Sequence, residues 1–337
     1  MTEQEIYASI QVASEDDPLR PEFPADHPSF PASLAVPLKL EGFTSVWIKN
    51  EASNPTGTHK DRMAWEIVVT YRDIIAKRMA DGIADRYPLP HFSIISSGSA
   101  AFAIQTQLRK YGLLNLKVLV DSGIEDRIYS ALVNIGCEVY VTDLSKKLLN
   151  TNDILEITNN REGIDITSNE ALDPTLRFYD WMSYEILNLS PEYCFLPFGS
   201  GGLYENVLNI NKRTVSSSKT DPRFMGEIST ARGCHFLGAT TSNPRSKADK
   251  LYSPFSPFRH YNEQWIRMYK IAGYCGNESG VYNVKEHSLE MAQALAEQQE
   301  IECEPSGIAG LALLLEMRDR VRRDARIVIV CTGKLKL

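Results

Sequence analysis

Short apolar runs alternate with longer amphipathic segments along most of the chain. The runs are rich in β-branched and aromatic residues, which strands favour, and the clearest span residues 46–48, 92–95, 117–120, 138–141, 194–198, 235–239 and 326–331. Between them, helical patterns with apolar residues at three- and four-residue spacing fit. This alternation predicts an α/β fold with two lobes, each an open, twisted, mostly parallel sheet flanked by helices.

The predicted strands fall into two groups, with a natural boundary near residues 150–165. The first part of the chain is acidic and then proline-rich, a composition that favours an extended arm over a packed element. We therefore expect an arm over residues 1–36, a smaller α/β domain over 37–160 and a larger one over 161–337. Residues 205–232 are polar and residues 241–264 lack clear periodicity, and the sequence leaves open whether these segments shape a substrate site or are simply mobile loops.

Composition narrows the class of protein. The formal net charge of −7 argues against a general nucleic-acid binder. The six cysteines are spread singly, without spacing typical of a metal site, so we expect core thiols in a cytoplasmic protein and no metal. No apolar segment is long enough to span a bilayer, and the acidic start is unlike a secretory signal.

The segment that ends at Lys60 carries the strongest chemical signal. Residues 54–60 read Asn-Pro-Thr-Gly-Thr-His-Lys, a turn-forming sequence. Lys60 is predicted to lie in the first turn of a helix, because an apolar stripe follows at helical spacing: Ile67, Val68, Tyr71, Ile74 and Ile75. The positive end of a helix favours the free amine, which attacks aldehydes. Lys60 is thus a candidate for Schiff-base chemistry; the alternative is an ordinary Lys-Asp-Arg cluster at a helix start.

A glycine-rich turn follows a predicted strand in the second half of the chain. It consists of Gly199, Ser200, Gly201, Gly202 and Leu203 and precedes a helical pattern, so its backbone N–H groups can face an anion. The turn lacks the spacing of a dinucleotide fingerprint and the lysine of a nucleotide P-loop. A phosphate cradle and a plain strand–helix turn are both consistent with these residues.

Two hydroxyl-bearing segments also end predicted strands. Ser96, Ser97, Gly98 and Ser99 present N–H groups and hydroxyls at a helix start, which suits a carboxylate; the alternative is a helix cap made by Ser97 or Ser99. Thr332 follows the last strand, where a hydroxyl could pair with a neutral ring nitrogen.

In order and spacing, these segments resemble the fold-type-II pyridoxal-phosphate enzymes. That family includes threonine synthase, cysteine synthase, serine/threonine dehydratase and the tryptophan synthase β subunit. Its members carry N-P-T-G-S-x-K-D-R around the Schiff-base lysine, an S-S-G-N-A-A turn, a G-x-G-G phosphate turn and a late Ser or Thr. The match covers about residues 37–337. The resemblance implies a tryptophan synthase β-like fold and pyridoxal 5′-phosphate as the cofactor.

The resemblance also implies a role for each segment. Lys60 would form the internal aldimine and carry the proton at the substrate Cα, and His59 would assist at the phosphate. Gly199, Ser200, Gly201, Gly202 and Leu203 would cradle the phosphate, and Thr332 would face the ring nitrogen. Ser96, Ser97, Gly98 and Ser99 would receive the substrate carboxylate. Ser99 also stands where most members have an asparagine that contacts the ring hydroxyl, which a serine could reach only through a water or a shifted loop.

The motifs look closest to the threonine synthase branch. Residues 49–57 read K-N-E-A-S-N-P-T-G, residues 303–306 read C-E-P-S and residues 332–336 read T-G-K-L-K. We expect a lyase-type elimination or replacement on an amino acid with a leaving group at Cβ or Cγ, in a homodimer. The alternatives are a cysteine-synthase-like β-replacement, a dehydratase-type deamination, and a pyridoxal-phosphate-binding protein without catalysis.

Overall fold

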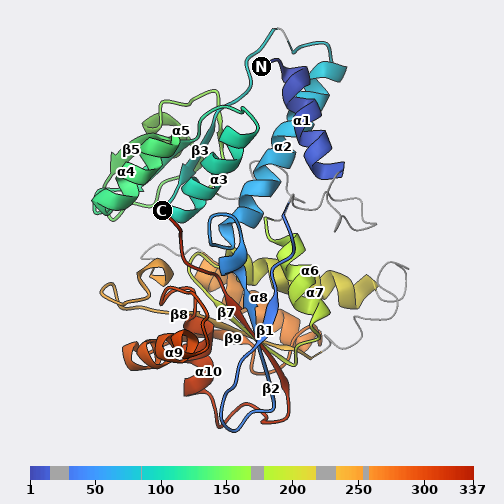
Figure 1. Ribbon diagram of the computed structural model, residues 1–337, viewed down its shortest axis with the longest axis vertical. Coiled ribbons are helices and arrows are strands. Elements are labelled where there is room, and N and C mark those ends of the chain that lie inside the picture. The colour runs from blue at the N-terminus through green and yellow to red at the C-terminus, as the bar shows by residue number, and fades with distance from the viewer. Residues whose placement is uncertain (16–29, 85, 168–177, 218–232, 253–257) are drawn as a thin grey trace. The chain divides into compact units, whose positions relative to one another are not determined.

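The computed structural model describes residues 1–15, 30–84, 86–167, 178–217, 233–252 and 258–337 (Figure 1). The helices are α1 (Glu3–Glu15), α2 (Lys60–Ala80), α3 (Ser99–Lys110), α4 (Asp126–Ile135), α5 (Thr151–Ile157), α6 (Asp180–Asn188), α7 (Gly202–Ser217), α8 (Phe258–Ile271), α9 (Glu286–Gln298) and α10 (Ala309–Glu316). The strands are β1 (Ala35–Pro37), β2 (Ser45–Asn50), β3 (Phe92–Ile95), β4 (Lys117–Asp121), β5 (Glu138–Thr142), β6 (Ile164–Asp165), β7 (Tyr193–Pro197), β8 (His235–Thr240), β9 (Gly280–Asn283) and β10 (Arg326–Cys331). Two short 3-10 helices are η1 (Glu51–Ser53) and η5 (Asp249–Leu251).

The chain divides into two compact units. The first contains residues 1–31, 60–178 and 337, and the second contains residues 32–59 and 179–336. The boundary between the segments 37–160 and 161–337 that the sequence suggested stays a prediction. Residues 32–59 belong with the later part of the chain because β2 pairs along its whole length with β10, where Ile48 lies opposite Ile329.

A parallel four-stranded sheet forms the centre of the first unit, in the order β5-β4-β3-β6. Helices α4 and α5 pack on its strands, and α2 packs against α3. The predicted stripe on α2 is confirmed for four of its five residues, since Ile67, Val68, Tyr71 and Ile75 are fully buried whereas Ile74 is half-buried. This packing fixes the helix whose first residue is Lys60.

The second unit is built on a six-stranded sheet in the order β1-β2-β10-β7-β8-β9. Only β1 runs antiparallel to its neighbour among these described strands. Helix α10 packs on β7, β8 and β10, and α9 packs on α10 (Figure 1). The core between them consists of aliphatic residues such as Leu311, Leu314 and Ile329, each of which is fully buried. The mixed α/β architecture with mostly parallel sheets flanked by helices is the predicted one.

The extended arm expected over residues 1–36 was wrong for its first part, where α1 forms. Ile6 and Ile10, four residues apart on one face of α1, are buried, and α1 packs on α2. Arg78 of α2 also pairs with Glu3, at 3.0 Å between Nη2 and Oε1. Most of the expected proline-rich stretch, residues 16–29, lies outside the described residues.

The six cysteines are all buried and free, which confirms the prediction of core thiols. No helix within the described ranges is long and apolar enough to cross a membrane.

Candidate active site

Lys60 is the first residue of α2, as the sequence predicted. Strand β2 leads into η1, and the turn Asn54–Thr58 then delivers the chain to His59 and Lys60. The turn is closed by a hydrogen bond from the Gly57 N–H to the Asn54 carbonyl oxygen at 2.9 Å. Glycine is required at position 57, because φ is +84° and a Cβ there would lie 2.4 Å from the Lys334 carbonyl oxygen.

The same turn pairs with the segment that follows β10. Thr58 forms an antiparallel bridge with Gly333. The His59 N–H donates to the Thr332 carbonyl oxygen at 3.1 Å, and the Lys334 N–H donates to the Gly57 carbonyl oxygen at 2.9 Å. The structure therefore brings together two segments that the sequence analysis selected separately, and the residue before Lys60 is bonded directly to Thr332.

Thr332 is held by its main chain on two sides and is buried. Its N–H donates to the Gly307 carbonyl oxygen at 3.0 Å, and its carbonyl oxygen accepts from His59. Next to it, hydrogen bonding to Cys303 and full burial raise the pKa of the Cys331 thiol well above its ordinary value. The Cys331 thiol therefore stays uncharged, and the Thr332 hydroxyl beside it is likewise a donor or acceptor that carries no charge.

The glycine-rich turn joins β7 to α7 in the second unit. Strand β7 ends at Pro197 and α7 begins at Gly202, so the turn lies between a strand and a helix as predicted, and the N–H groups of the first helical turn have no partners within the helix. Gly201 has a φ of +92°, and a Cβ on Gly199 would lie 2.8 Å from the Lys250 carbonyl oxygen. Ser200 is exposed. These glycines allow a close backbone approach that side chains would prevent.

Two hydrogen-bonded side chains fix the start of α7. The Tyr204 hydroxyl donates to the Phe236 carbonyl oxygen on β8 at 2.8 Å. Asn206 Nδ2 donates to Asp180 Oδ1 on α6 at 2.8 Å. Both Tyr204 and Asn206 are buried, so these bonds hold the start of α7, and with it the glycine-rich turn, in a fixed position.

Tyr179 connects the glycine-rich turn with His59, and the sequence analysis did not select it. The ring centroids of His59 and Tyr179 are 5.3 Å apart, and Tyr179 Cε2 is 4.0 Å from the position that a Cβ on Gly202 would occupy. Tyr179 is buried, and its own N–H donates to Asn206 Oδ1 at 3.2 Å. A single aromatic residue without a motif gave no signal in the sequence; only the fold places it here.

The serine turn belongs to the first unit and lies between β3 and α3. Ser96 Oγ accepts hydrogen bonds from the N–H groups of Gly98 at 3.1 Å and Ala101 at 3.3 Å. The predicted alternative was a helix cap made by Ser97 or Ser99. In the structure the Ser96 hydroxyl instead accepts the hydrogen bonds from the N–H groups at the start of α3. Ser97 is exposed, Ser99 is half-buried as the first residue of α3, and Gly98 has a φ of +126° that favours glycine.

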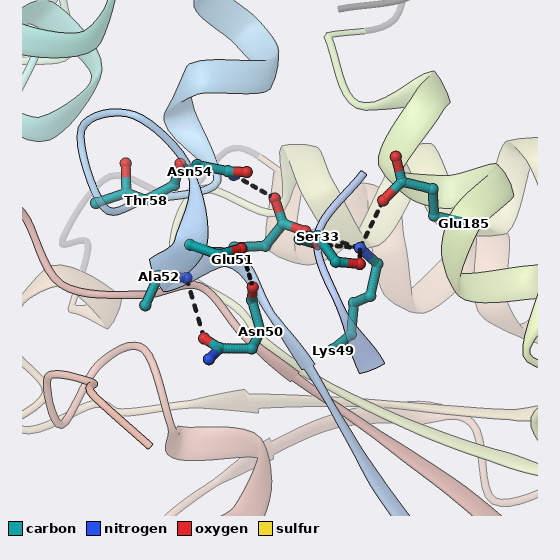
Figure 2. Close-up of polar contacts among 9 residues, drawn as sticks. Ser33, Lys49, Asn50, Glu51, Ala52, Asn54, Thr58 and Glu185 are labelled. Carbon is teal, nitrogen blue, oxygen red and sulfur yellow. Dashed lines mark hydrogen bonds and ion pairs between the residues drawn. The ribbon is translucent and has the colours of Figure 1, made fainter. Parts of the chain in front are cut away.

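A buried polar network supports the turn before Lys60 (Figure 2). Lys49 Nζ lies 2.5 Å from Glu185 Oε2 and 3.2 Å from Glu51 Oε1, and it donates to the Ser33 carbonyl oxygen at 2.8 Å. The Ser33 hydroxyl bonds to both Lys49 and Glu51. The other oxygen of Glu51, Oε2, accepts from Asn54 Nδ2 at 2.6 Å. Lys49 and Glu51 entered the sequence-based prediction only as part of a motif. A lysine and a glutamate at the end of an apolar strand are the signal from which a buried ion pair could have been predicted.

The site residues divide between the two units. His59, Gly199, Ser200, Gly201, Gly202, Leu203 and Thr332 belong to the second unit, whereas Lys60, Ser96, Ser97, Gly98 and Ser99 belong to the first. Within the second unit His59, Tyr179, Gly202 and Thr332 are linked by the contacts described above. No group of His, Cys, Asp and Glu side chains suited to a metal ion occurs in the described part of the chain.

The residues present suit a phosphorylated aldehyde cofactor. A lysine at a helix start can form a Schiff base, the glycine-rich turn at the start of α7 offers N–H groups to a phosphate, and Thr332 offers a buried neutral hydroxyl to a ring nitrogen. The fold and these groups define an α/β enzyme that uses pyridoxal phosphate.

Comparison with known proteins leads to the same class. The model of the family described as pyridoxal-phosphate dependent enzyme matches residues 33–333. The chain belongs to this family, and its cofactor is pyridoxal 5′-phosphate.

Individual relatives are distant. Threonine synthase from Synechocystis sp. is 23% identical over 339 residues, which cover 98% of this chain and 81% of the relative. The crystal structure of O-ureido-L-serine synthase matches with a TM-score of 0.62 at 16% identity, over 90% of this chain and 89% of the other. The processed form of threonine deaminase isoform 2 from Solanum lycopersicum matches with a TM-score of 0.56 at 13% identity, over 98% of this chain and 90% of the other. The structural matches establish the shared fold.

Proposed function

We propose that this enzyme catalyses elimination or replacement on an amino acid that carries a leaving group at Cβ or Cγ, in the manner of threonine synthase. The observation that carries the proposal is the hydrogen bond from the His59 N–H to the Thr332 carbonyl oxygen, which joins the lysine segment to the residue whose hydroxyl is expected at the cofactor ring. A full-length relative named threonine synthase supports this branch. The bound cofactor supplies an electron sink for the bond electrons at the substrate Cα.

The residues of the chain take distinct roles in this proposal. Lys60 anchors the cofactor and then moves the proton at the substrate Cα as a general base. The backbone N–H groups of residues 199–203 bind the phosphate, with His59 and Tyr179 beside them. Thr332 meets the ring nitrogen without giving it a proton, since a hydroxyl cannot hold a charged ring nitrogen as a carboxylate would.

The serine turn completes the proposed machinery. The exposed Ser97 hydroxyl and the N–H groups at the start of α3 are the groups that would bind the substrate carboxylate, because a helix N-terminus favours an anion. Ser96 acts indirectly in this proposal, since its hydroxyl already holds Gly98 and Ala101 in place. A homodimer in the cytoplasm remains the expected setting.

The anchor is tested with Lys60→Ala. We expect this variant to lose the visible absorption band of the lysine-bound cofactor and to lose about 10²- to 10⁴-fold in turnover, the effect of removing a general base. Lys285→Ala is the control, because Lys285 also lies at a helix start, the N-cap of α9, but is exposed. A band that persists in Lys60→Ala would show that another residue holds the cofactor.

The reaction is tested by adding amino acids to the loaded protein and identifying the products. O-phosphohomoserine is expected to shift the visible band and to yield phosphate and a hydroxy-amino acid. Ammonia and an oxo acid from serine or threonine would indicate a deaminase, and turnover of O-acetylserine with sulfide would indicate β-replacement. A band that shifts with none of these substrates would refute catalysis of this class.

A further inference from the structure

The turn that delivers Lys60 to α2 is held from two sides by different kinds of bond. On one side, main-chain hydrogen bonds join residues 56–59 to residues 332–336. On the other side, Asn54 Nδ2 donates to Glu51 Oε2 at 2.6 Å and to the Thr58 carbonyl oxygen at 3.1 Å. The amide therefore ties a carboxylate on η1 to the backbone two residues before Lys60 (Figure 2).

The orientation of the Asn54 side chain follows from its partners. Both partners of Nδ2 are oxygen acceptors, and only the NH₂ end of an amide can donate to them. Asn54 is buried, so water does not compete freely for these bonds. A fixed amide in turn fixes the position of the Thr58 carbonyl group.

Glu51 can hold Asn54 only if the carboxylate is itself fixed. Its two oxygens have different tasks, because Oε1 bonds to Lys49 and Ser33 whereas Oε2 bonds to Asn54. Lys49 is anchored in addition by Glu185 and by the Ser33 carbonyl oxygen. Lys49 and Glu51 are almost completely buried, at 2% and 0% exposure, and a buried charge is tolerated only when it is paired and hydrogen-bonded.

We propose that Glu51 and Asn54 are positioning residues for Lys60, and that the Lys49 ion pair holds them in place. The network holds the Thr58 carbonyl group, two residues before Lys60. It thereby sets the point at which α2 begins and the position of the lysine amine. This inference rests on the proposed anchoring of the cofactor by Lys60. None of these side chains is assigned a contact with the substrate or with the cofactor.

The test uses Glu51→Gln, which keeps the shape of the side chain and removes its charge, and Asn54→Ala, which removes both hydrogen bonds of Nδ2. For each full-length variant the apparent dissociation constant for pyridoxal phosphate is measured by absorbance. The fraction of Lys60 that becomes covalently labelled after borohydride reduction is measured by peptide mass spectrometry. Asp165→Asn is the matched control, because Asp165 is also a buried carboxylate with hydrogen bonds, to Thr151 and Thr167, but lies in the other unit.

We expect both network variants to weaken cofactor binding about tenfold or more, the scale of one hydrogen bond to a charged group, and to lower the labelled fraction of Lys60. The control should lose thermal stability without either change. Network variants that lose stability but bind and label like the unaltered protein would overturn the inference and leave the proposed function intact. If Glu51→Gln does not fold, Asn54→Ala decides the matter. If Lys60→Ala still shows the visible band and becomes labelled at another residue after borohydride reduction, the proposed function and this inference both fail.

Discussion

Ser99 is the residue at which this chain departs most clearly from the motif it resembles. It is the first residue of α3, is half-buried and follows Gly98, whose φ of +126° fixes the direction in which the helix starts. A Cβ on Gly98 would lie 2.5 Å from Ile128 Cγ2, so the turn has little freedom to bring a short side chain forward. We propose that position 99 is where one side chain decides whether the turn contacts the cofactor directly.

We expect Ser99→Asn to raise turnover of the best amino-acid substrate about fivefold. The longer amide would form a direct hydrogen bond where serine needs a water or a shifted loop, and one such bond contributes on the order of 1 kcal/mol. The measurement is kcat together with the position of the visible band. Ser130→Asn is the control, because Ser130 lies in the same unit at an exposed position on α4 and has no role in the proposed site. Equal kinetics in Ser99→Asn and the unaltered protein would make this departure incidental.

Individual site residues were predictable from the sequence where a motif fixed both residue type and spacing. Lys60 at a helix start and the glycine-rich turn before α7 lie where the pattern placed them. It was not predictable that Ser96, and not Ser97 or Ser99, accepts the hydrogen bonds at the start of α3. The path of the turn decides which hydroxyl faces the N–H groups. Tyr179 and Glu51 depend on contacts between distant segments, which a local pattern does not contain.

Among the elements, the pairing between residues 56–59 and 332–336 depends on Gly333. Its φ is +90°, and a Cβ there would lie 2.0 Å from the Gly57 carbonyl oxygen. A side chain at this position would separate the two segments, and with them Thr332 and His59.

Gly333→Ala is expected to lower the free energy of unfolding by about 3 kcal/mol, because it combines a strained φ with a backbone clash. Cofactor binding should weaken at the same time. Gly233→Ala is the matched control: its φ of +80° is similar, but nothing lies within 4 Å of the added Cβ, so only about 1 kcal/mol of backbone strain is expected. Chemical denaturation measures both variants. Equal losses of unfolding free energy in the two variants would show that the backbone near residue 333 shifts to accept the added Cβ without losing stability.

Elements with a long, clear pattern were predictable, and short ones were not. Each of the strand-like apolar runs became a strand, from β2 to β10. Strands β1 and β6 were missed because they have only three and two residues. Strand β9 was missed because it begins with glycine and ends with asparagine, which strands disfavour. Helix α1 was missed because its acidic residues concealed two apolar positions, Ile6 and Ile10, that only packing on α2 makes significant.

At the scale of the whole molecule, the family was predictable from the order of four segments, whereas the boundary between the two expected domains stays a prediction. The sequence suggested a boundary from local pattern, but compactness depends on which strands pair. Strand β2 lies between β1 and β10, so an early segment becomes part of the later unit. The lysine segment thus passes from the second unit to the first between His59 and Lys60, and a resemblance to motifs alone does not reveal such a crossing.

The pH dependence of global stability provides a test of the packing in the second unit. His235 begins β8, its ring is stacked on Tyr193 at 4.6 Å, and its Nδ1 accepts the Glu278 N–H at 3.0 Å. Burial lowers the pKa of His235 below its ordinary value of 6.5, because the charged ring would lose solvent. Its Nδ1 must also stay unprotonated to accept the Glu278 bond. The folded protein therefore favours the neutral ring.

For a group whose pKa is lower in the folded state, stability is fully present above the unfolded value of about 6.5 and is lost as the pH falls through the folded value. We expect the melting temperature to decrease as the pH is lowered from 7.5 to about 5. In His235→Asn the melting temperature should decrease less over the same pH range, because the contribution of His235 is removed. Asparagine keeps an oxygen acceptor for the Glu278 N–H but cannot take up a proton, so the stability of the variant depends less on acid. At neutral pH the variant is less stable than the unaltered protein, because it loses the stacking on Tyr193. His287→Asn, at an exposed position on α9, controls for the removal of a histidine. An undiminished acid response in His235→Asn would mean that other groups, and not the strand end at β8, control the loss of stability in acid.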